Sequence, residues 1–168
     1  MDTIRVAVPS IIEHIANVVV GFVDTIMVAK LGTIATTAVG INSTITWFLM
    51  AFSTLFAVGT TVQVAQSIGA NNHQRAKRAS INGLSGGFIL FAIIFIVMYS
   101  LSPYIPKWLG AERAILPDAV SYLRIWTLAI VPMFLGRIAS SILRGSGNTK
   151  VPMIVAFFIN ILNVIGNF

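Results

Sequence analysis

The 168-residue chain is 57% hydrophobic and only 10% charged, whereas soluble domains carry roughly 25% charged residues. Its formal charge is +6, but the basic residues stand singly or in short connectors, not in the patch or stripe of a nucleic-acid-binding protein. This pattern excludes a soluble domain and a nucleic-acid partner, and the absence of cysteine excludes disulfides and thiolate chemistry.

The first predicted helix covers residues 4–29 and is unusually polar for a membrane span. Glu13 and His14 interrupt its apolar run, so it does not fit a cleaved signal peptide. Its end is set by Gly32, since glycine commonly terminates helices. For Glu13 we favour a structural role, either at the inner membrane interface or in a pair with Arg5 or His14.

The same helix carries the polar face on which the functional hypothesis depends. At 100° per residue, Glu13, Asn17 and Asp24 lie within about 40° of one another and share one face. An ionisable residue inside a span costs roughly 2.5–3.5 kcal/mol and is by default a functional candidate. Glu13 and Asp24 are about 16 Å apart along the helix. They therefore cannot form a catalytic carboxylate pair, and no enzyme activity is expected.

Four further apolar segments follow, at residues 37–68, 81–104, 118–143 and 151–168. Each is long enough to cross a bilayer and far longer than a membrane β-strand. Pro132 predicts a kink in the fourth segment, and Gly83 and Gly87 predict close packing of the third against its neighbours. The fold class is all-α: one transmembrane domain of residues 1–168, with about five helices in a lipid bilayer.

The positions of the basic residues predict the orientation of these helices. Arg75, Lys77 and Arg78 mark the second connector, while Arg144 and Lys150, with Arg137 nearby, mark the fourth. Lys and Arg in short loops are retained in the cytoplasm. We therefore expect the N-terminus and both connectors on the cytoplasmic side of the plasma membrane.

Depth along the helices brings other polar residues to the level of Asp24. The fifth helix rises outward from Lys150, which puts Asn163 and Asn167 roughly 20–25 Å above that residue, on one helix face. Asn42, Thr46 and Tyr122 of the second and fourth helices are expected in the same outer half of the membrane, and Asn17 of the first helix is a further supporting candidate. Such a set could bind Na⁺ or pass H⁺ in competition with a cationic substrate. Interhelical hydrogen bonding is the alternative role for Asn163 and Asn167.

Three stretches of the sequence carry a family resemblance. They are Pro9 with GFVDTIMVAKLG at residues 21–32 and AVG at 38–40, QSIGA at 66–70, and LRGSGNTKVP at 143–152. In this order they resemble the multidrug and toxic compound extrusion (MATE) family. The resemblance implies an antiporter of two six-helix lobes that exports organic cations against Na⁺ or H⁺. Asp24 and Asn163 match its N-terminal cation site, and Asn167 falls where some members carry a second acid.

The resemblance also implies that this chain is an incomplete N-terminal lobe that lacks the sixth helix and the C-terminal lobe. Alternating access needs two lobes, so a non-transporting fragment is one alternative. A flippase for lipid-linked saccharides, of the same superfamily, is another. The acidic and amide-rich interior favours the exporter over the flippase, which would need cations to meet phosphates.

Overall fold

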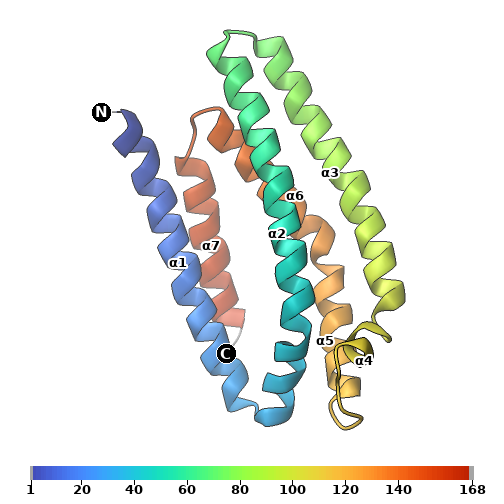
Figure 1. Ribbon diagram of the computed structural model, residues 1–168. Coiled ribbons are helices and arrows are strands. Elements are labelled where there is room, and N and C mark those ends of the chain that lie inside the picture. Colours follow the sequence, from blue (N-terminus) through green and yellow to red (C-terminus); the bar gives the residue numbers. More distant parts are fainter. Residues whose placement is uncertain (1, 167–168) are drawn as a thin grey trace.

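A computed structural model describes residues 2–166, with the side chains of Val8 and residues 11–166. This part of the chain is helical and contains no strand. The helices are α1 (Asp2–Lys30), α2 (Thr33–Gly69), α3 (His73–Leu101), α4 (Ile105–Trp108), α5 (Leu116–Leu128), α6 (Ile130–Gly145) and α7 (Lys150–Gly166) (Figure 1). The all-α prediction is confirmed.

Helix α3 begins eight residues before the predicted position. Asn72 caps it by accepting a hydrogen bond from the backbone N–H of Arg75 at 2.9 Å, and Asn71 takes the left-handed conformation, φ 55°, that closes the turn. The basic residues assigned to a loop therefore lie in the first turns of α3. Long basic side chains tolerate this position because they reach into the headgroup region while their stems cover apolar surface.

The fourth predicted helix is two helices, α5 and α6, bent by 43° at Ala129. Pro132 is the physical cause, because it has no N–H to donate to the carbonyl of Leu128 and its ring crowds that carbonyl. The helical hydrogen bonds resume when Met133 donates to Ala129 at 3.0 Å. The predicted kink is confirmed, and it lies one turn before the proline.

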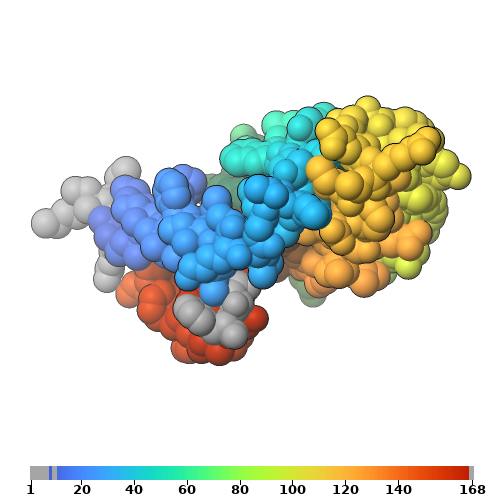
Figure 2. Space-filling model, turned by 90° about the horizontal axis from the view of Figure 1, so that it is seen from below, coloured from blue at the N-terminus to red at the C-terminus, as the bar shows by residue number. Residues whose placement is uncertain are grey.

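The helices form a bundle and a separate pair. α2, α3, α5 and α6 pack around a core in which Phe91 and Phe134 are fully buried, with ring centroids 4.4 Å apart. The cluster of buried core residues comprises Leu49, Phe91, Met98, Ile105, Leu123, Ile130, Phe134 and Ile138. Helices α1 and α7 pack chiefly on each other beside this bundle, as the view along the helices shows (Figure 2).

Two glycines explain how closely the bundle helices approach. A Cβ atom at Gly83 would lie 2.7 Å from Thr60 Cγ2 of α2, and one at Gly87 would clash with Ile138 of α6. Both contacts confirm the predicted packing role. By length and composition three helices, α1, α2 and α3, could cross a membrane, and the bent α5–α6 pair could form a fourth span. The described part of α7 is a shorter apolar helix.

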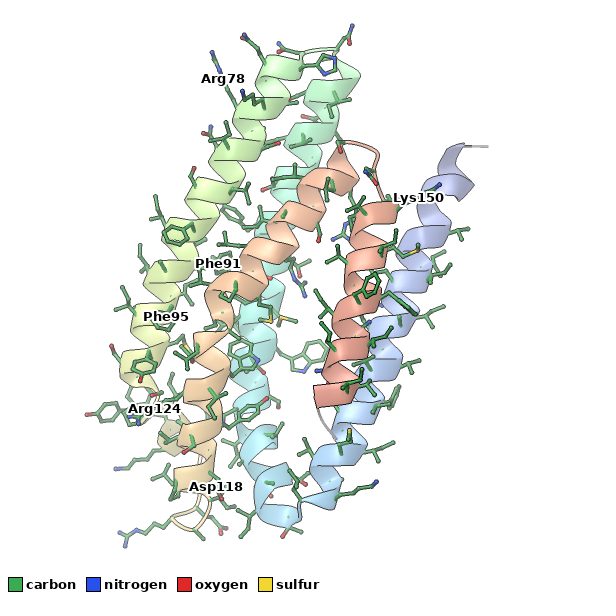
Figure 3. All side chains as sticks on the ribbon, turned by 180° about the vertical axis from the view of Figure 1, so that it is seen from behind. Arg78, Phe91, Phe95, Asp118, Arg124 and Lys150 are labelled. Atoms are coloured by element: carbon green, nitrogen blue, oxygen red, sulfur yellow. The ribbon has the colours of Figure 1, made fainter. Side chains whose placement is uncertain are left out.

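Both predicted basic connectors lie at the same end of the molecule. Arg78 and Lys150 mark this end, whereas Asp118 and Arg124 lie at the opposite end (Figure 3). The described N-terminal part of α1 lies at the end with Arg78 and Lys150 (Figure 1). The N-terminal parts of α1 and α7 therefore lie at the same end of the molecule, and the two helices pack on each other.

Candidate functional site

The register of α1 against α7 is defined by one hydrogen bond within the described residues. Asn160 Nδ2 donates to Asn17 Oδ1 at 2.9 Å. Both helices run from the end marked by Lys150 toward the opposite end (Figure 3), so they are parallel and equal steps along each keep residues level. Asn17 therefore lies on the α1 face that meets α7, and its amide makes an interhelical hydrogen bond.

This register brings Asn163 near the level of Asp24. Asp24 lies seven residues beyond Asn17 and Asn163 lies three beyond Asn160, so their levels along the parallel helices differ by four residues, or about 6 Å. Asp24 is half-buried, Asn163 is exposed, and each takes part in an interaction. The side chain of Asn167 lies outside the described residues. Asp24 and Asn163 supply carboxylate and amide oxygens, the hard ligands that suit Na⁺.

The remaining supporting candidates belong to the bundle. Asn42 is fully buried and donates from Nδ2 to the carbonyls of Ala38 and Ala119, both at 2.9 Å, so it joins α2 to α5. Its Oδ1 is a buried acceptor without a hydrogen-bond partner among the described residues. Thr46 donates to Ser43 of its own helix, and Tyr122 is half-buried on α5. The structure therefore gives Asn42 a packing contact and does not bring it to Asp24.

A second polar group joins α1 to α6 nearer the end marked by Lys150. Arg144 Nη1 donates to both carboxylate oxygens of Glu13, each at 3.0 Å, and the two side chains are only 31% and 16% exposed. The predicted structural role of Glu13 holds, but His14 is the wrong partner. Arg5 lies outside the described side chains. Sequence separation hid the true partner, 131 residues away.

Arg137 lies inside α6, eight residues before its end, within the predicted fourth helix and not in the connector that it neighbours in sequence. Its Nη1 donates to Thr54 Oγ1 at 3.0 Å, and its Nη2 lies 3.8 Å from Met50 Sδ. Both partners belong to α2. The charges of Arg144 and Glu13 also act on this guanidinium, so the charged groups of α1 and α6 are linked to two uncharged side chains of α2.

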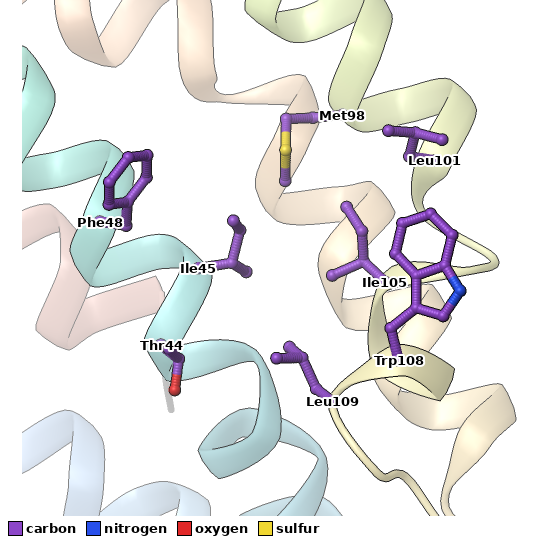
Figure 4. Close-up of a pocket in the computed structure, with 8 residues that line it drawn as sticks. All are labelled: Thr44, Ile45, Phe48, Met98, Leu101, Ile105, Trp108 and Leu109. Carbon is purple, nitrogen blue, oxygen red and sulfur yellow. The ribbon is translucent and has the colours of Figure 1, made fainter.

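A cavity of about 440 Å³ between α2, α3 and α4 is apolar, in contrast to the polar contacts described above (Figure 4). It is lined by Thr44, Ile45, Phe48, Met98, Leu101, Ile105, Trp108 and Leu109. No charged side chain is among them, so this cavity suits apolar groups and not an inorganic ion. The candidate ion-binding groups therefore lie between α1 and α7.

Asn160 was not predicted as a site residue. It precedes Asn163 by three residues, so helical spacing could have placed it on the same face. Arg137 was named only for its closeness to the fourth connector, although it lies seven residues from Arg144 on one face of the predicted helix. Helical periodicity applied to both residues would have indicated their partners' side of the helix.

Comparison with known proteins identifies the relatives of the chain. The family model described as MatE matches residues 9–168. The multidrug resistance protein NorM of Vibrio cholerae is 28% identical over 167 residues, and the transporter YisQ of Bacillus subtilis is 27% identical over 165 residues. These matches cover 97% and 95% of this chain but only 35% of each relative. The chain thus spans about a third of their length.

A solved structure shows the same fold. The crystal structure of MATE in complex with MaD3S superposes with a TM-score of 0.95 at 23% identity, covering 99% of this chain and 37% of that one. The agreement extends over every helix from α1 to α7. At this level of identity the likeness concerns the fold, and the chemistry of the site is argued from the residues of this chain.

Proposed function

The chain belongs to the MatE family of membrane transporters, and we propose that it is part of a secondary antiporter that exports organic cations in exchange for Na⁺ or H⁺. The whole transporter includes a second lobe, against which this one rocks. The coverage of its relatives, about a third of their length, supports a partner lobe. Orientation follows from the basic connectors, with the N-terminus in the cytoplasm of a cell whose plasma membrane holds the protein.

The observation that carries this proposal is an intramembrane acid at the level of amide side chains. The Asn17–Asn160 hydrogen bond at 2.9 Å supports placing Asp24 within about 6 Å of the depth of Asn163. A carboxylate in an apolar span is costly unless it is protonated or binds a cation. H⁺, Na⁺ and a cationic substrate therefore compete for one group, and competition of this kind is what exchange requires. No comparable group supports the flippase alternative at this level.

The test is dye efflux from cells that express the gene encoding this chain. Ethidium efflux is measured with an imposed Na⁺ gradient and, separately, with an imposed pH gradient. We expect one gradient to drive efflux and Asp24→Asn to abolish it, because the amide keeps the shape of the side chain but cannot carry the charge. Immunoblots of isolated membranes confirm that the variant inserts.

Asp118→Asn is the matched control, since this exposed acid lies in the first turn of α5, outside the α1–α7 pair. It should export ethidium at the wild-type rate. Wild-type efflux in Asp24→Asn would refute the assigned role of Asp24. An absence of efflux under both gradients, with the protein present in the membrane, would refute cation-coupled export.

A further inference from the structure

The charged groups between α1 and α6 leave an uncompensated positive charge within the membrane-spanning region. Glu13 supplies one negative charge, whereas Arg137 and Arg144 supply two positive charges. Glu13 is already committed to Arg144, with both carboxylate oxygens accepting from its Nη1. Arg137 therefore has no carboxylate hydrogen-bonded to it among the described residues, and its contacts are with α2.

The partners of Arg137 engage only part of the hydrogen-bonding capacity of its guanidinium group. Its five N–H donors match the two oxygens of a carboxylate or phosphate group. In this structure they meet one hydroxyl, Thr54 Oγ1, and one weak sulfur acceptor, Met50 Sδ. The side chain is half-buried and so still accessible. A guanidinium about 12 Å from the end of its helix is costly to keep in a membrane, and simple packing would not require it.

We propose that Arg137, supported by Arg144, forms a binding site for the acidic group of an amphipathic molecule. The site takes a carboxylate or a phosphate ester, and Thr54 of α2 orients the guanidinium by accepting from Arg137 Nη1 while it donates to the carbonyl of Met50. The site lies on the part of α6 nearer the end expected to face the cytoplasm. It is separate from Asp24, whose carboxylate attracts positive charge. Where the ligand is the exported molecule, the inference rests on the proposed function and makes the substrates zwitterionic: a positive group for Asp24 and an acidic group for Arg137.

The test is binding to the purified chain in phosphatidylcholine nanodiscs. The probe is a dansyl-labelled undecanoate, compared with its neutral amide and its quaternary ammonium counterpart. We expect the wild-type chain to bind the carboxylate more tightly than the amide. Arg137→Gln should weaken carboxylate binding about tenfold, the effect of losing a hydrogen bond to a charged group. Arg137→Lys should recover part of it, because the charge stays while the fork geometry is lost.

Arg113→Gln is the matched control, since this exposed arginine lies outside the helices, between α4 and α5. It should bind all three probes as the wild type does. Equal carboxylate affinity in wild type and Arg137→Gln would overturn the proposal. An equal loss of all three probes would also overturn it, because that result describes a packing residue and not an anion site.

A last arm distinguishes a lipid headgroup from a small molecule as the natural ligand. Phosphatidylglycerol is added to the nanodiscs. If phosphatidylglycerol competes with the probe in the wild type but not in Arg137→Gln, the site is supported and its ligand is a lipid phosphate. If probe binding is undiminished by this lipid, the site is supported with a small-molecule ligand. Either result stands apart from ethidium efflux, which tests Asp24, so the two proposals can fail separately.

Discussion

At the scale of single residues, the close approach of α6 to α2 depends on Gly145. A Cβ atom there would lie 2.7 Å from the carbonyl oxygen of Thr61 and 3.1 Å from Val64 Cβ. The first contact is with backbone, so a side-chain rotation cannot relieve it. Thr61 strengthens the same junction by donating from Oγ1 to the carbonyl of Ser141 at 3.1 Å. The junction is therefore intolerant of even one added methyl group.

We predict that Gly145→Ala destabilises the bundle by about 1–3 kcal/mol, the usual cost of overpacking a close contact. The measurement is the midpoint of thermal unfolding in detergent, followed by size-exclusion chromatography. Gly136→Ala is the matched control on the same helix, because nothing lies within 4 Å of the added Cβ. That variant should be neutral or more stable by up to about 1 kcal/mol, owing to the higher helix propensity of alanine. A midpoint for Gly145→Ala at or above that of Gly136→Ala would contradict the packing argument.

The contacts between side chains of different helices were the feature least predictable from the sequence. Periodicity put Glu13, Asn17 and Asp24 on one face of α1, since an angle of 100° per residue is a local property. Which helix that face meets is decided by tertiary packing, and so Arg144 and Asn160 could not be named in advance. Asn42 shows the same limit: its depth was derived from the sequence, but the contact with Ala119 depends on how α2 packs on α5.

At the scale of elements, the apolar runs predicted the helices well because an uninterrupted run of about 20 apolar residues has few other solutions in a bilayer. The predicted boundaries are wrong where a helix extends beyond its apolar part, as at the start of α3. They are also wrong where one apolar segment holds two helices, as in α5 and α6. Pro132 predicted the kink. The short helix α4 was not predicted, because Pro106 is the only feature of its sequence that indicates a helix start.

The pairing of α1 with α7 yields a prediction at this scale. The chain has no cysteine, so introduced pairs can be oxidised without a background reaction. We expect Asn17→Cys combined with Asn160→Cys to form a disulfide on treatment with copper phenanthroline, because the two side chains are in contact. The readout is a mobility shift, reversible by reduction, on gel electrophoresis after cleavage at a protease site inserted in the α6–α7 connector.

The control pair is Asn17→Cys with Met153→Cys, which lies seven residues, or about 10 Å, away along α7. Disulfide geometry requires Cα atoms within about 7 Å, so this pair should stay reduced. Equal cross-linking of both pairs would show that α1 slides along α7. The level of Asp24 relative to Asn163 would then no longer be fixed.

At the scale of the whole molecule, exposed apolar side chains cover the outer faces of the long helices, among them Phe22, Leu55, Ile96 and Phe158. Lipid or further protein must cover such surfaces, because contiguous apolar patches of this size are rare on soluble proteins. The separate α1–α7 pair and the bundle of α2, α3, α5 and α6 are joined by the Glu13–Arg144 ion pair. The Arg137 site lies along the seam between these two parts, whereas the groups of the Asp24 site belong to the α1–α7 pair itself.

The basic residues at one end of the molecule lead to a prediction of membrane topology. Thr33 and Ala114 lie at one end of the molecule, while His73 and Ser146 lie at the other, beside the basic residues. Because basic connectors stay in the cytoplasm, single cysteines at Thr33 and Ala114 should react with a membrane-impermeant maleimide added to intact cells. Cysteines at His73 and Ser146 should react only after the membrane is permeabilised.

All four positions are exposed in the structure, so a lack of labelling reports the side of the membrane and not burial. Labelling of His73→Cys in intact cells, with protection of Ala114→Cys, would invert the orientation. In that case Asp24 would lie in the inner half of the membrane and Arg137 in the outer half, and an exporter would meet the two groups in the opposite order. The direction in which a zwitterionic substrate enters this lobe thus follows from four labelling reactions.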